Sequence, residues 1–202
     1  MLATWRAEAA RFTPGLRVNL VEETAGKASG AAAAGRMAGA DPQAGQPPWS
    51  GADVVVTSYT LLRLDADLYA AGDFACVVLD EAQFAKNPRT RVHRAVQALR
   101  ADMVVAVTGT PLENSLTELW ALLALACPGL FPSPRRFREE YVKPIEQGKV
   151  PENEEGGPYR ERRLERLRSR VRPFVLRRTK ELVAPELPPR QEQVLTIELG
   201  PA

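Results

Sequence analysis

The sequence predicts an α/β protein built on a parallel β-sheet, and three observations support this fold class. Three short runs, at residues 53–57, 74–79 and 103–107, consist mainly of consecutive apolar side chains. Such runs are typical of strands that are covered on both faces of a parallel sheet. Stretches with helical spacing separate the runs, and polar or small residues follow each of them. Strands that alternate with helices predict right-handed crossovers, with ligands bound beyond the carboxyl ends of the strands.

Three segments precede the first of these apolar runs. Residues 2–12 have apolar side chains at helical spacing and predict a helix. Residues 16–22 predict a short strand. Residues 25–50 are rich in Ala, Gly, Pro and Gln and show no periodicity, so they predict a low-complexity loop.

Helices are predicted between the apolar strands. The spacing of Leu61, Leu64 and Leu68 predicts one helix with these three side chains on its buried face. A second helix is predicted over residues 90–100. It contains His93, the single histidine of the chain, which stands between arginines and is expected at the surface.

From residue 115 onward the sequence predicts mainly helices. Ser115 and Glu118 have the spacing of a capping box, in which each side chain bonds the backbone N–H of the other residue. Further helices are predicted over residues 134–142 and 159–171, with a stop at the following proline. Residues 191–199 predict an edge strand or a connector.

Charge is unevenly distributed along the chain. The net charge of +2 is nearly neutral and does not by itself indicate a nucleic-acid partner. Residues 160–180, however, contain ten basic side chains against two acidic ones. This segment predicts a strongly positive surface, and the alternative is a solvated helix face without a binding function.

Cysteine usage and hydropathy indicate a cytoplasmic protein. Cys76 and Cys127 lie in apolar runs without metal-ligand spacing, so we expect reduced thiols in the core. No run approaches the roughly 18 apolar residues of a membrane span. The first residues are amphipathic, unlike a secretory signal.

Acidic and hydroxyl side chains follow two neighbouring strands. Asp80 and Glu81 directly follow the second apolar run, and residues 108–110 (Thr-Gly-Thr) follow the third. At a strand end, one carboxylate can hold hydrated Mg²⁺ while the next orients or deprotonates a water molecule. The alternative is a helix cap at Asp80 and an ordinary polar turn at 108–110. Because both patterns occur in order at the expected sheet edge, they favour phosphoryl-transfer chemistry.

Six stretches of the chain, in the same order, resemble the motifs of the Swi/Snf family of superfamily 2 helicase-like DNA translocases. They are TWRAEAARFTPGLRV, VVVTSYTLL, VVLDEAQFAKNP, VTGTPLENSLTELWALLALACPGLF, RFREEYVKPIE and RPFVLRRTKELVAPELPPRQEQV. The third is an acidic box with Gln in place of the commoner His. The resemblance implies an incomplete, parallel-sheet RecA-like lobe of the P-loop NTPase type over residues 1–131. It also implies a helical extension over residues 132–202 that leads towards a second motor lobe.

The same resemblance implies roles for individual residues, together with ATP and Mg²⁺ as cofactors and double-stranded DNA as the partner. Asp80 would hold Mg²⁺, Glu81 would activate water, and Gln83 would sense the nucleotide. Hydrolysis would be coupled to DNA movement by Thr108, Gly109 and Thr110. The residues near the DNA backbone would be Thr57, Ser58 and Tyr59. The inter-lobe geometry would be fixed by Arg177 and Arg178. The last two arginines have salt bridges as an alternative role. Lys86 and Asn87 receive no role.

The sequence contains no phosphate-binding loop of the form G-x-x-x-x-G-K-[ST]. The pairs Gly26-Lys27 and Gly148-Lys149 lack both a glycine five positions earlier and a following Ser or Thr. In the resembled family this loop precedes the first matching stretch. We therefore expect an N-terminal segment and a second lobe to come from the same or a companion chain. Residues 1–202 alone are expected neither to hydrolyse ATP nor to fold robustly.

Two other functions remain open at the level of sequence. The chain can be a DNA- or protein-binding remnant without ATPase activity that uses the basic face of residues 160–180. It can also be an RNA helicase, although SLTELWALL and RPFVLRRTK argue against this by resemblance. As a DNA motor it is expected at the nucleoid of a bacterial cell.

Overall fold

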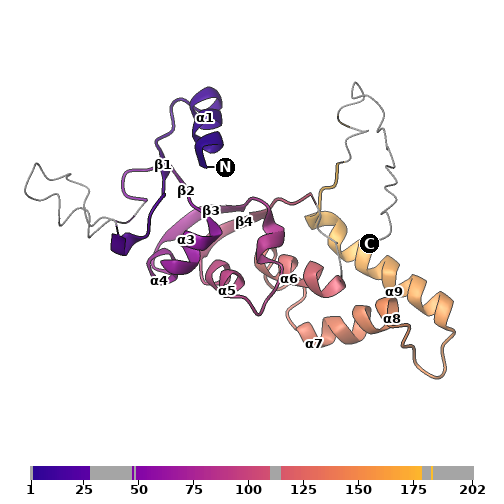
Figure 1. The fold of residues 1–202 in the computed structure, drawn as a ribbon. Coiled ribbons are helices and arrows are strands. Elements are labelled where there is room, and N and C mark those ends of the chain that lie inside the picture. The colour runs from indigo at the N-terminus through magenta and orange to yellow at the C-terminus, as the bar shows by residue number, and fades with distance from the viewer. Residues whose placement is uncertain (1, 28–46, 48, 110–114, 179–182, 184–202) are drawn as a thin grey trace, which may run out of the picture. The chain divides into compact units, whose positions relative to one another are not determined.

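The computed structural model describes residues 2–27, 47, 49–109, 115–178 and 183 (Figure 1). Most of the predicted loop 25–50, the coupling residue Thr110 and the tail 191–199 lie outside these residues. Backbone contacts divide the chain into two compact units, Met1–Leu164 and Glu165–Ala202. The division expected from the resemblance, at residue 131, stays a prediction.

The first parallel pair of strands consists of β1 (Val18–Leu20) and β2 (Val54–Val56). Just before them, Arg17 and Asp53 form a two-pronged ion pair, with Nη2 2.9 Å from Oδ1 and Nε 3.0 Å from Oδ2. Hydrogen bonds from the side chain and backbone of Arg17 lower the pKa of Asp53 to about 2. Because the pair is exposed to solvent, it contributes little to the free energy of unfolding, and its main effect is on the orientation of the two strands.

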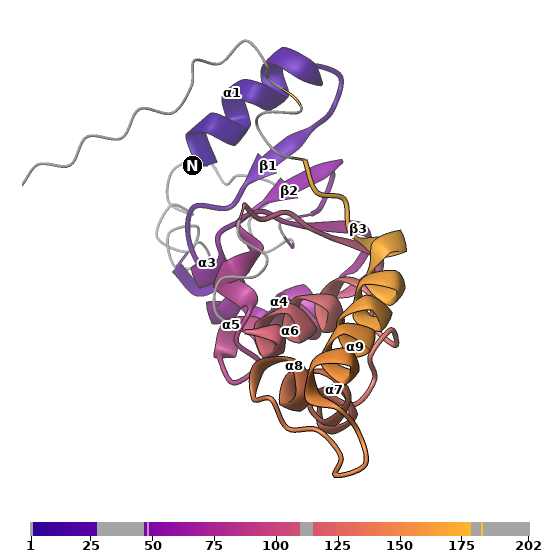
Figure 2. The same ribbon diagram turned by 90° about the vertical axis from the view of Figure 1, so that its right-hand side faces the viewer.

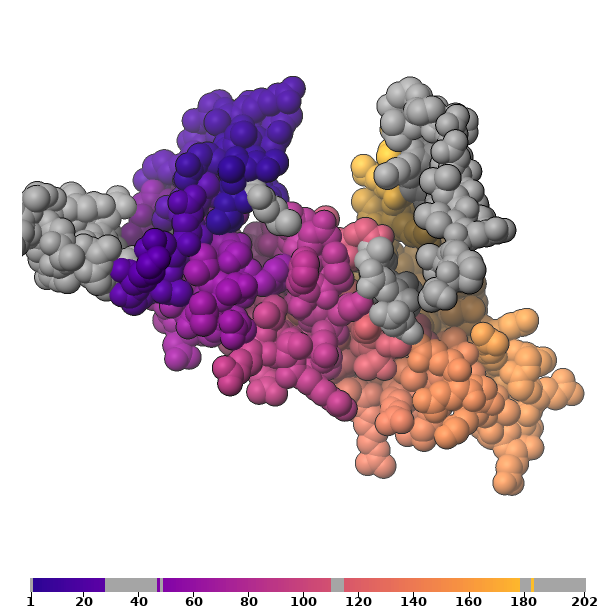
Figure 3. All heavy atoms as spheres, in the orientation of Figure 1, coloured from indigo at the N-terminus to yellow at the C-terminus, as the bar shows by residue number. Residues whose placement is uncertain are grey.

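The N-terminal helix α1 (Leu2–Phe12) precedes β1 and contacts it. None of its residues is buried, and Trp5 and Phe12 are 41% and 67% exposed. Its indigo atoms stand out from the rest of the first unit in Figure 3. The predicted helix is thus confirmed, with Trp5 and Phe12 exposed to solvent.

The second parallel pair consists of β3 (Asp73–Leu79) and β4 (Arg100–Ala106). The α/β class with parallel strands is therefore confirmed. β4 begins three residues before the apolar run, because Arg100 pairs with Asp73 in the backbone register and through an ion pair of 3.1 Å. The helix before it, α5 (Arg91–Gln97), is correspondingly shorter than predicted.

Helices gather on one side of the β3–β4 pair, as Figures 1 and 2 both show. They are α3 (Tyr59–Leu64), α4 (Ala66–Ala70), α5 and α6 (Leu116–Ala126). The core on this side is formed by Leu62, Tyr69, Leu79, Ala82, Ala85, Ala95, Val96, Leu122 and Leu125. In the space-filling view, residues 49–109 form one continuous mass of atoms (Figure 3).

The expectation that the strands are buried on both faces is wrong for the residues described. Val78 of β3 and Met103 of β4 are each 55% exposed, because helices of the described chain cover only the opposite face. Cys76 is exposed for the same reason, and Cys127 is half-buried. Both thiols are free, but neither belongs to the core.

The helix predicted from the leucine spacing is interrupted. It forms two helices, α3 and α4, with a break at Asp65, whose φ and ψ are −109° and 34°. The Asp65 carboxylate accepts a hydrogen bond of 2.8 Å from the amide of Ala25. The buried side chains are Leu62 in α3 and Tyr69 in α4, while Leu64 is 54% exposed.

Helix α6 begins where the capping-box pattern predicts. Ser115 is its N-cap, and its Oγ accepts a hydrogen bond of 3.3 Å from the amide of Glu118. The carboxylate of Glu118 turns instead towards Lys86, with Nζ and Oε2 3.2 Å apart. The Glu118 side chain thus forms an ion pair with a residue distant in sequence, whereas the capping-box pattern predicts that it accepts a hydrogen bond from the Ser115 amide.

The remaining helices are α7 (Pro134–Phe137), the π-helical turn η2 (Arg138–Val142), α8 (Lys143–Glu146), α9 (Gly156–Val171) and η3 (Arg172–Phe174). They include those predicted over residues 134–142 and 159–171, together with two short helices, α8 and η3, that were not predicted. The Glu146 carboxylate of α8 accepts a hydrogen bond from the amide of Leu116, which adds a second cap to α6. Among the helices described, none is both long and apolar enough to cross a membrane.

Candidate functional site

The acidic pair lies in a tight turn at the carboxyl end of β3. Glu81 has φ 49° and ψ 50°, the left-handed region, and is the single non-glycine residue with positive φ in the described chain. Such a conformation costs an ordinary residue about 1–2 kcal/mol. Val107, the residue after strand β4, secures it: its amide donates to the Leu79 carbonyl, and the Ala82 amide donates to its carbonyl, both at 2.9 Å.

Asp80 is half-buried and is oriented by its own backbone neighbour. Its Oδ1 accepts a hydrogen bond of 3.0 Å from the amide of Glu81. Its carbonyl oxygen accepts a second bond, of 2.9 Å, from the hydroxyl of Tyr59. Hydrogen bonds within the chain therefore hold both the side chain and the main chain of Asp80 without a ligand.

Gln83 connects the acidic pair with the turn that follows β4. Its Nε2 donates to Glu81 Oε2 at 2.6 Å, and its Oε1 accepts from Thr108 Oγ1 at 2.7 Å. All three side chains are partly buried, so water competes less for these bonds than it would at the surface. The two motifs that the sequence places at neighbouring strand ends thus meet through one amide group.

Tyr59 lies close to both acidic side chains. Burial, with smaller contributions from the negative charges of Asp80 and Glu81, raises the pKa of Tyr59 to about 12. The phenol therefore stays protonated at neutral pH and acts as a hydrogen-bond donor.

The three residues predicted at the DNA backbone direct their side-chain oxygens into the chain. The Thr57 hydroxyl is buried beside that of Tyr69. The Ser58 hydroxyl caps α3 by accepting a bond of 3.2 Å from the amide of Leu61. With Tyr59 bonded to Asp80, each hydroxyl has an internal position, and contact of this segment with DNA stays a prediction.

The remaining predicted site residues are Gly109, Thr110, Arg177 and Arg178. Gly109 directly follows Thr108 and is exposed, and Thr110 lies outside the described residues. Arg177 and Arg178 are exposed. Within the described part of the chain neither arginine forms an ion pair, so the salt-bridge alternative has no support there.

His93 supports the acidic turn, and the expectation that it lies at the surface is wrong. It is 2% exposed, and its Nδ1–H donates to the carbonyl of Ala85 at 2.8 Å. Ala85 is the last residue of the short helix η1 (Ala82–Ala85), which continues the acidic turn. The spacing to Val96, three residues later on the buried face of α5, is the sequence signal that indicates this position.

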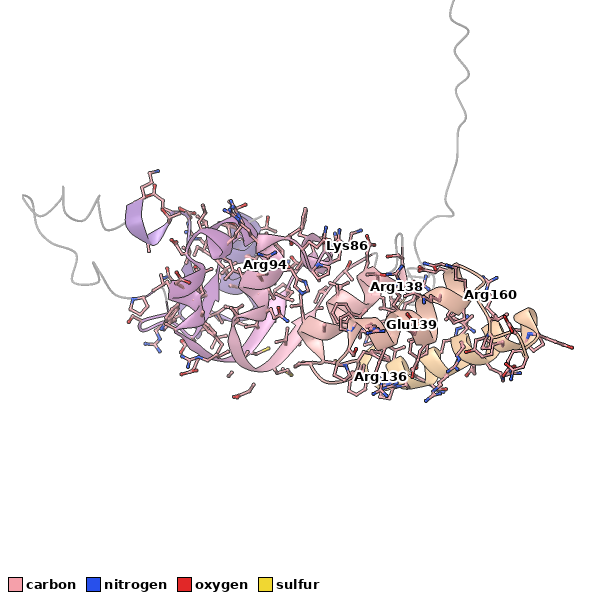
Figure 4. All side chains as sticks on the ribbon, turned by 90° about the horizontal axis from the view of Figure 1, so that it is seen from below. Lys86, Arg94, Arg136, Arg138, Glu139 and Arg160 are labelled. Atoms are coloured by element: carbon pink, nitrogen blue, oxygen red, sulfur yellow. The ribbon has the colours of Figure 1, made fainter. Side chains whose placement is uncertain are left out.

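Lys86 is a second residue near the site to which the sequence assigned no role. Its ion pair with Glu118 joins the end of η1 to the first turn of α6, and Lys86 is labelled in Figure 4. The two side chains are only 20% and 23% exposed. No local sequence pattern indicates this pair, because its members are 32 positions apart.

The oxygen donors at these strand ends fit a hydrated Mg²⁺ ion bound together with a nucleotide. Mg²⁺ keeps several waters and takes one or two carboxylates with substrate phosphates. Asp80 supplies such a carboxylate, with Glu81 and the Thr108 hydroxyl nearby. Among the described residues no group of three or more His, Cys, Asp and Glu side chains forms a metal cage. This sparse set suits Mg²⁺ and a triphosphate better than a structural metal.

Sequence comparisons agree with this geometry. The sequence model of the SNF2-related domain matches residues 1–202. The chain is 42% identical over 148 residues to the Zorya protein ZorD of Escherichia coli, covering 73% of this chain and 13% of that protein. It is 35% identical over 159 residues to the TATA-binding protein-associated factor MOT1 of Saccharomyces cerevisiae, covering 77% and 8%. The chain thus spans a small part of the length of these relatives.

A comparison of structures gives the same result. The SWI2/SNF2 ATPase core of Sulfolobus solfataricus, solved in complex with double-stranded DNA, superimposes with a TM-score of 0.66 at 29% sequence identity. The match covers 89% of this chain and 32% of that one. The expected RecA-like fold is therefore confirmed, and the chain belongs to the SNF2-related domain family.

Proposed function

We propose that this chain supplies the metal-holding, water-activating and coupling part of the ATP site in a motor that moves along double-stranded DNA. The observation that carries the proposal is the hydrogen-bonded series Glu81–Gln83–Thr108. It connects the acidic box of one strand end with the predicted coupling turn of the next. Membership of the SNF2 family and the DNA complex of the Sulfolobus relative support the choice of reaction and partner.

Each carboxylate has a separate task in this proposal. Asp80 would hold Mg²⁺, which lowers the cost of charge on the transferred phosphate. Glu81 orients the attacking water and accepts its proton. Because Gln83 occupies Glu81 Oε2, the proton goes to Oε1. The Gln83 bond also restricts the rotamer of Glu81, so the base is positioned before water arrives.

Coupling follows from the second bond of Gln83. A change in the position or charge of Glu81 during the reaction alters the Gln83 amide, which in turn holds Thr108. Thr108 directly precedes Gly109, so the orientation of the chain after β4 depends on the state of the nucleotide. This is a local switch of the kind in which the γ-phosphate positions a neighbouring loop.

The phosphate-binding loop and the second lobe are proposed to come from elsewhere in the same or a companion chain. Arg177 and Arg178, both exposed, would contact that lobe. Purified residues 1–202 are therefore expected to show no DNA-stimulated ATP hydrolysis. Activity is expected when a section with a G-x-x-x-x-G-K-[ST] loop and a second lobe is supplied. DNA-stimulated hydrolysis by residues 1–202 alone would contradict this division of the site.

The Thr108→Val substitution tests the coupling bond. Valine keeps the shape of the side chain but removes the donor to Gln83, and losing such a bond costs about 0.5–1.5 kcal/mol. In the complete motor we expect DNA-stimulated hydrolysis to fall about two- to tenfold, with the KM for ATP unchanged. Thr117→Val, at an exposed position of α6, is the matched control. Equal DNA-stimulated rates in the two variants would exclude the proposed coupling role.

One observation favours the second candidate function, binding of DNA without ATPase activity. The basic face of α9 and its continuation is largely open to solvent. Its exposed members in the described chain are Arg160, Arg162, Arg166, Arg168, Arg172, Arg177 and Arg178. If this face is the functional site, DNA affinity will fall steeply with salt and will not respond to ATP.

A further inference from the structure

Tyr59 contacts the acidic box on both sides of its turn. Its hydroxyl donates to the carbonyl of Asp80 at 2.9 Å, at the start of the turn. Its ring lies against Phe84, which follows Gln83, with ring centroids 6.1 Å apart and an interplanar angle of 46°. One side chain of α3 thus reaches the residues immediately before Glu81 and immediately after Gln83.

The Asp80 carbonyl belongs to the same planar peptide as the Glu81 amide. Tyr59 binds the oxygen of this peptide, and Asp80 Oδ1 binds its N–H at 3.0 Å. Because a peptide group rotates as a rigid plane, two bonds on opposite edges fix its orientation. Of these two bonds, the one from Tyr59 comes from a different element of the fold.

Glu81 is the residue that needs this restraint. Its left-handed backbone is unfavourable for a side chain larger than glycine and persists only where surrounding contacts enforce it. Val107 restrains the far side of the turn through Ala82, and Tyr59 restrains the near side through Asp80. Loss of the near restraint lets the Asp80–Glu81 peptide rotate and moves the Glu81 carboxylate away from Gln83.

We propose that Tyr59 is a positioning residue, whose hydroxyl sets the Asp80–Glu81 peptide and connects the segment of Thr57 and Ser58 to the site of hydrolysis. The inference rests on the proposed function and deepens it. A shift of this segment, which leads directly into Tyr59, reaches the acidic pair through one hydrogen bond. Tyr59 then transmits the effect of DNA rather than binding DNA through its hydroxyl.

Tyr59→Phe is the direct test, because it removes the hydroxyl and retains the ring against Phe84. Tyr69→Phe is the matched control: it removes another core phenol hydroxyl, on a residue 4% exposed, that forms no hydrogen bond to the acidic turn among the described residues. The first measurement is amide hydrogen exchange at Glu81. We expect exchange to rise about five- to tenfold in Tyr59→Phe, the effect of losing one partly buried hydrogen bond, and to stay within twofold in the control.

The second measurement is steady-state ATP hydrolysis by the complete motor. Tyr59→Phe is expected to lower kcat at saturating DNA about three- to tenfold, with the KM for ATP and the DNA affinity within twofold of the parent. A loss of DNA affinity with kcat retained would instead make the hydroxyl a DNA contact and overturn the proposal. Unchanged exchange at Glu81 would overturn it as well.

A third variant, Tyr59→Leu, separates the ring from the hydroxyl. If Tyr59→Phe behaves as the parent while Tyr59→Leu loses activity, packing on Phe84 is the active element and the proposed hydrogen-bond role is wrong. If the parent motor hydrolyses no ATP, the proposed function fails. The exchange measurement still decides the positioning role, because it does not depend on turnover.

Discussion

Glu81→Gln is expected to lower ATP hydrolysis by a factor of about 10²–10⁴, the contribution of a positioned general base. Glutamine has nearly the same shape as glutamate and keeps an oxygen that can accept the bond from Gln83. The turn and its network therefore stay in place, and the change removes only the proton acceptor. Nucleotide binding should persist, because Glu81 is not the residue proposed to hold Mg²⁺.

The measurement is single-turnover hydrolysis by the complete motor at saturating DNA, together with ATP affinity and the thermal midpoint. Glu155→Gln, at an exposed position before α9, is the control for the loss of one negative charge. We expect parental rates for Glu155→Gln. Retention of more than a tenth of the parental rate by Glu81→Gln would remove Glu81 from the role of base.

Lys86→Met is expected to destabilise the protein by about 2–3 kcal/mol, close to the lower end of the range for breaking a buried ion pair. Both partners are only about a fifth exposed, with Nζ and Oε2 3.2 Å apart. Methionine keeps the aliphatic stem but leaves the Glu118 carboxylate without its cation. Helix η1 contains Gln83 of the acidic box, and α6 follows the coupling turn. Because the ion pair joins η1 to α6, its loss should also loosen both elements.

A double-mutant cycle separates this pair from the effects of the single changes. Replacing both partners, in Lys86→Met/Glu118→Leu, should recover part of the stability, with a coupling energy of about 1–2 kcal/mol by urea unfolding of the complete motor. The matched control is Glu139–Lys143, an i,i+4 pair at 2.7 Å whose side chains are 52% and 34% exposed (Figure 4 labels Glu139). Loss of this control pair should lower the free energy of unfolding by no more than about 0.5 kcal/mol. Equal costs for Lys86→Met and Lys143→Met would show that the Lys86 pair contributes no more than a surface pair.

Much of the fold follows from local patterns in the sequence. Apolar runs and helical spacing predict the four strands of the described chain and the helices near residues 2–12, 134–142 and 159–171, because periodicity reflects the geometry of each element. The place of Asp80, Glu81 and Thr108 also follows, since parallel strands end at one edge of their sheet.

Burial is the property that local patterns predict least well. His93 is buried and Leu64 is exposed, both contrary to expectation. Asp65 breaks the predicted helix into α3 and α4, and their buried residues are Leu62 and Tyr69 instead of the expected leucines. Such outcomes depend on which neighbour covers a face, and a single segment does not contain that information.

The sequence by itself determined the α/β class, the order of the elements and the two motifs at the strand ends. Only the tertiary structure decided how these motifs connect: Gln83 between Glu81 and Thr108, Tyr59 on Asp80, and Lys86 on Glu118. The physical reason is distance along the chain. The members of the pairs Gln83–Thr108, Tyr59–Asp80 and Lys86–Glu118 are 21 to 32 positions apart. They meet only after the strands and helices between them have packed, whereas periodicity and capping act within a few residues.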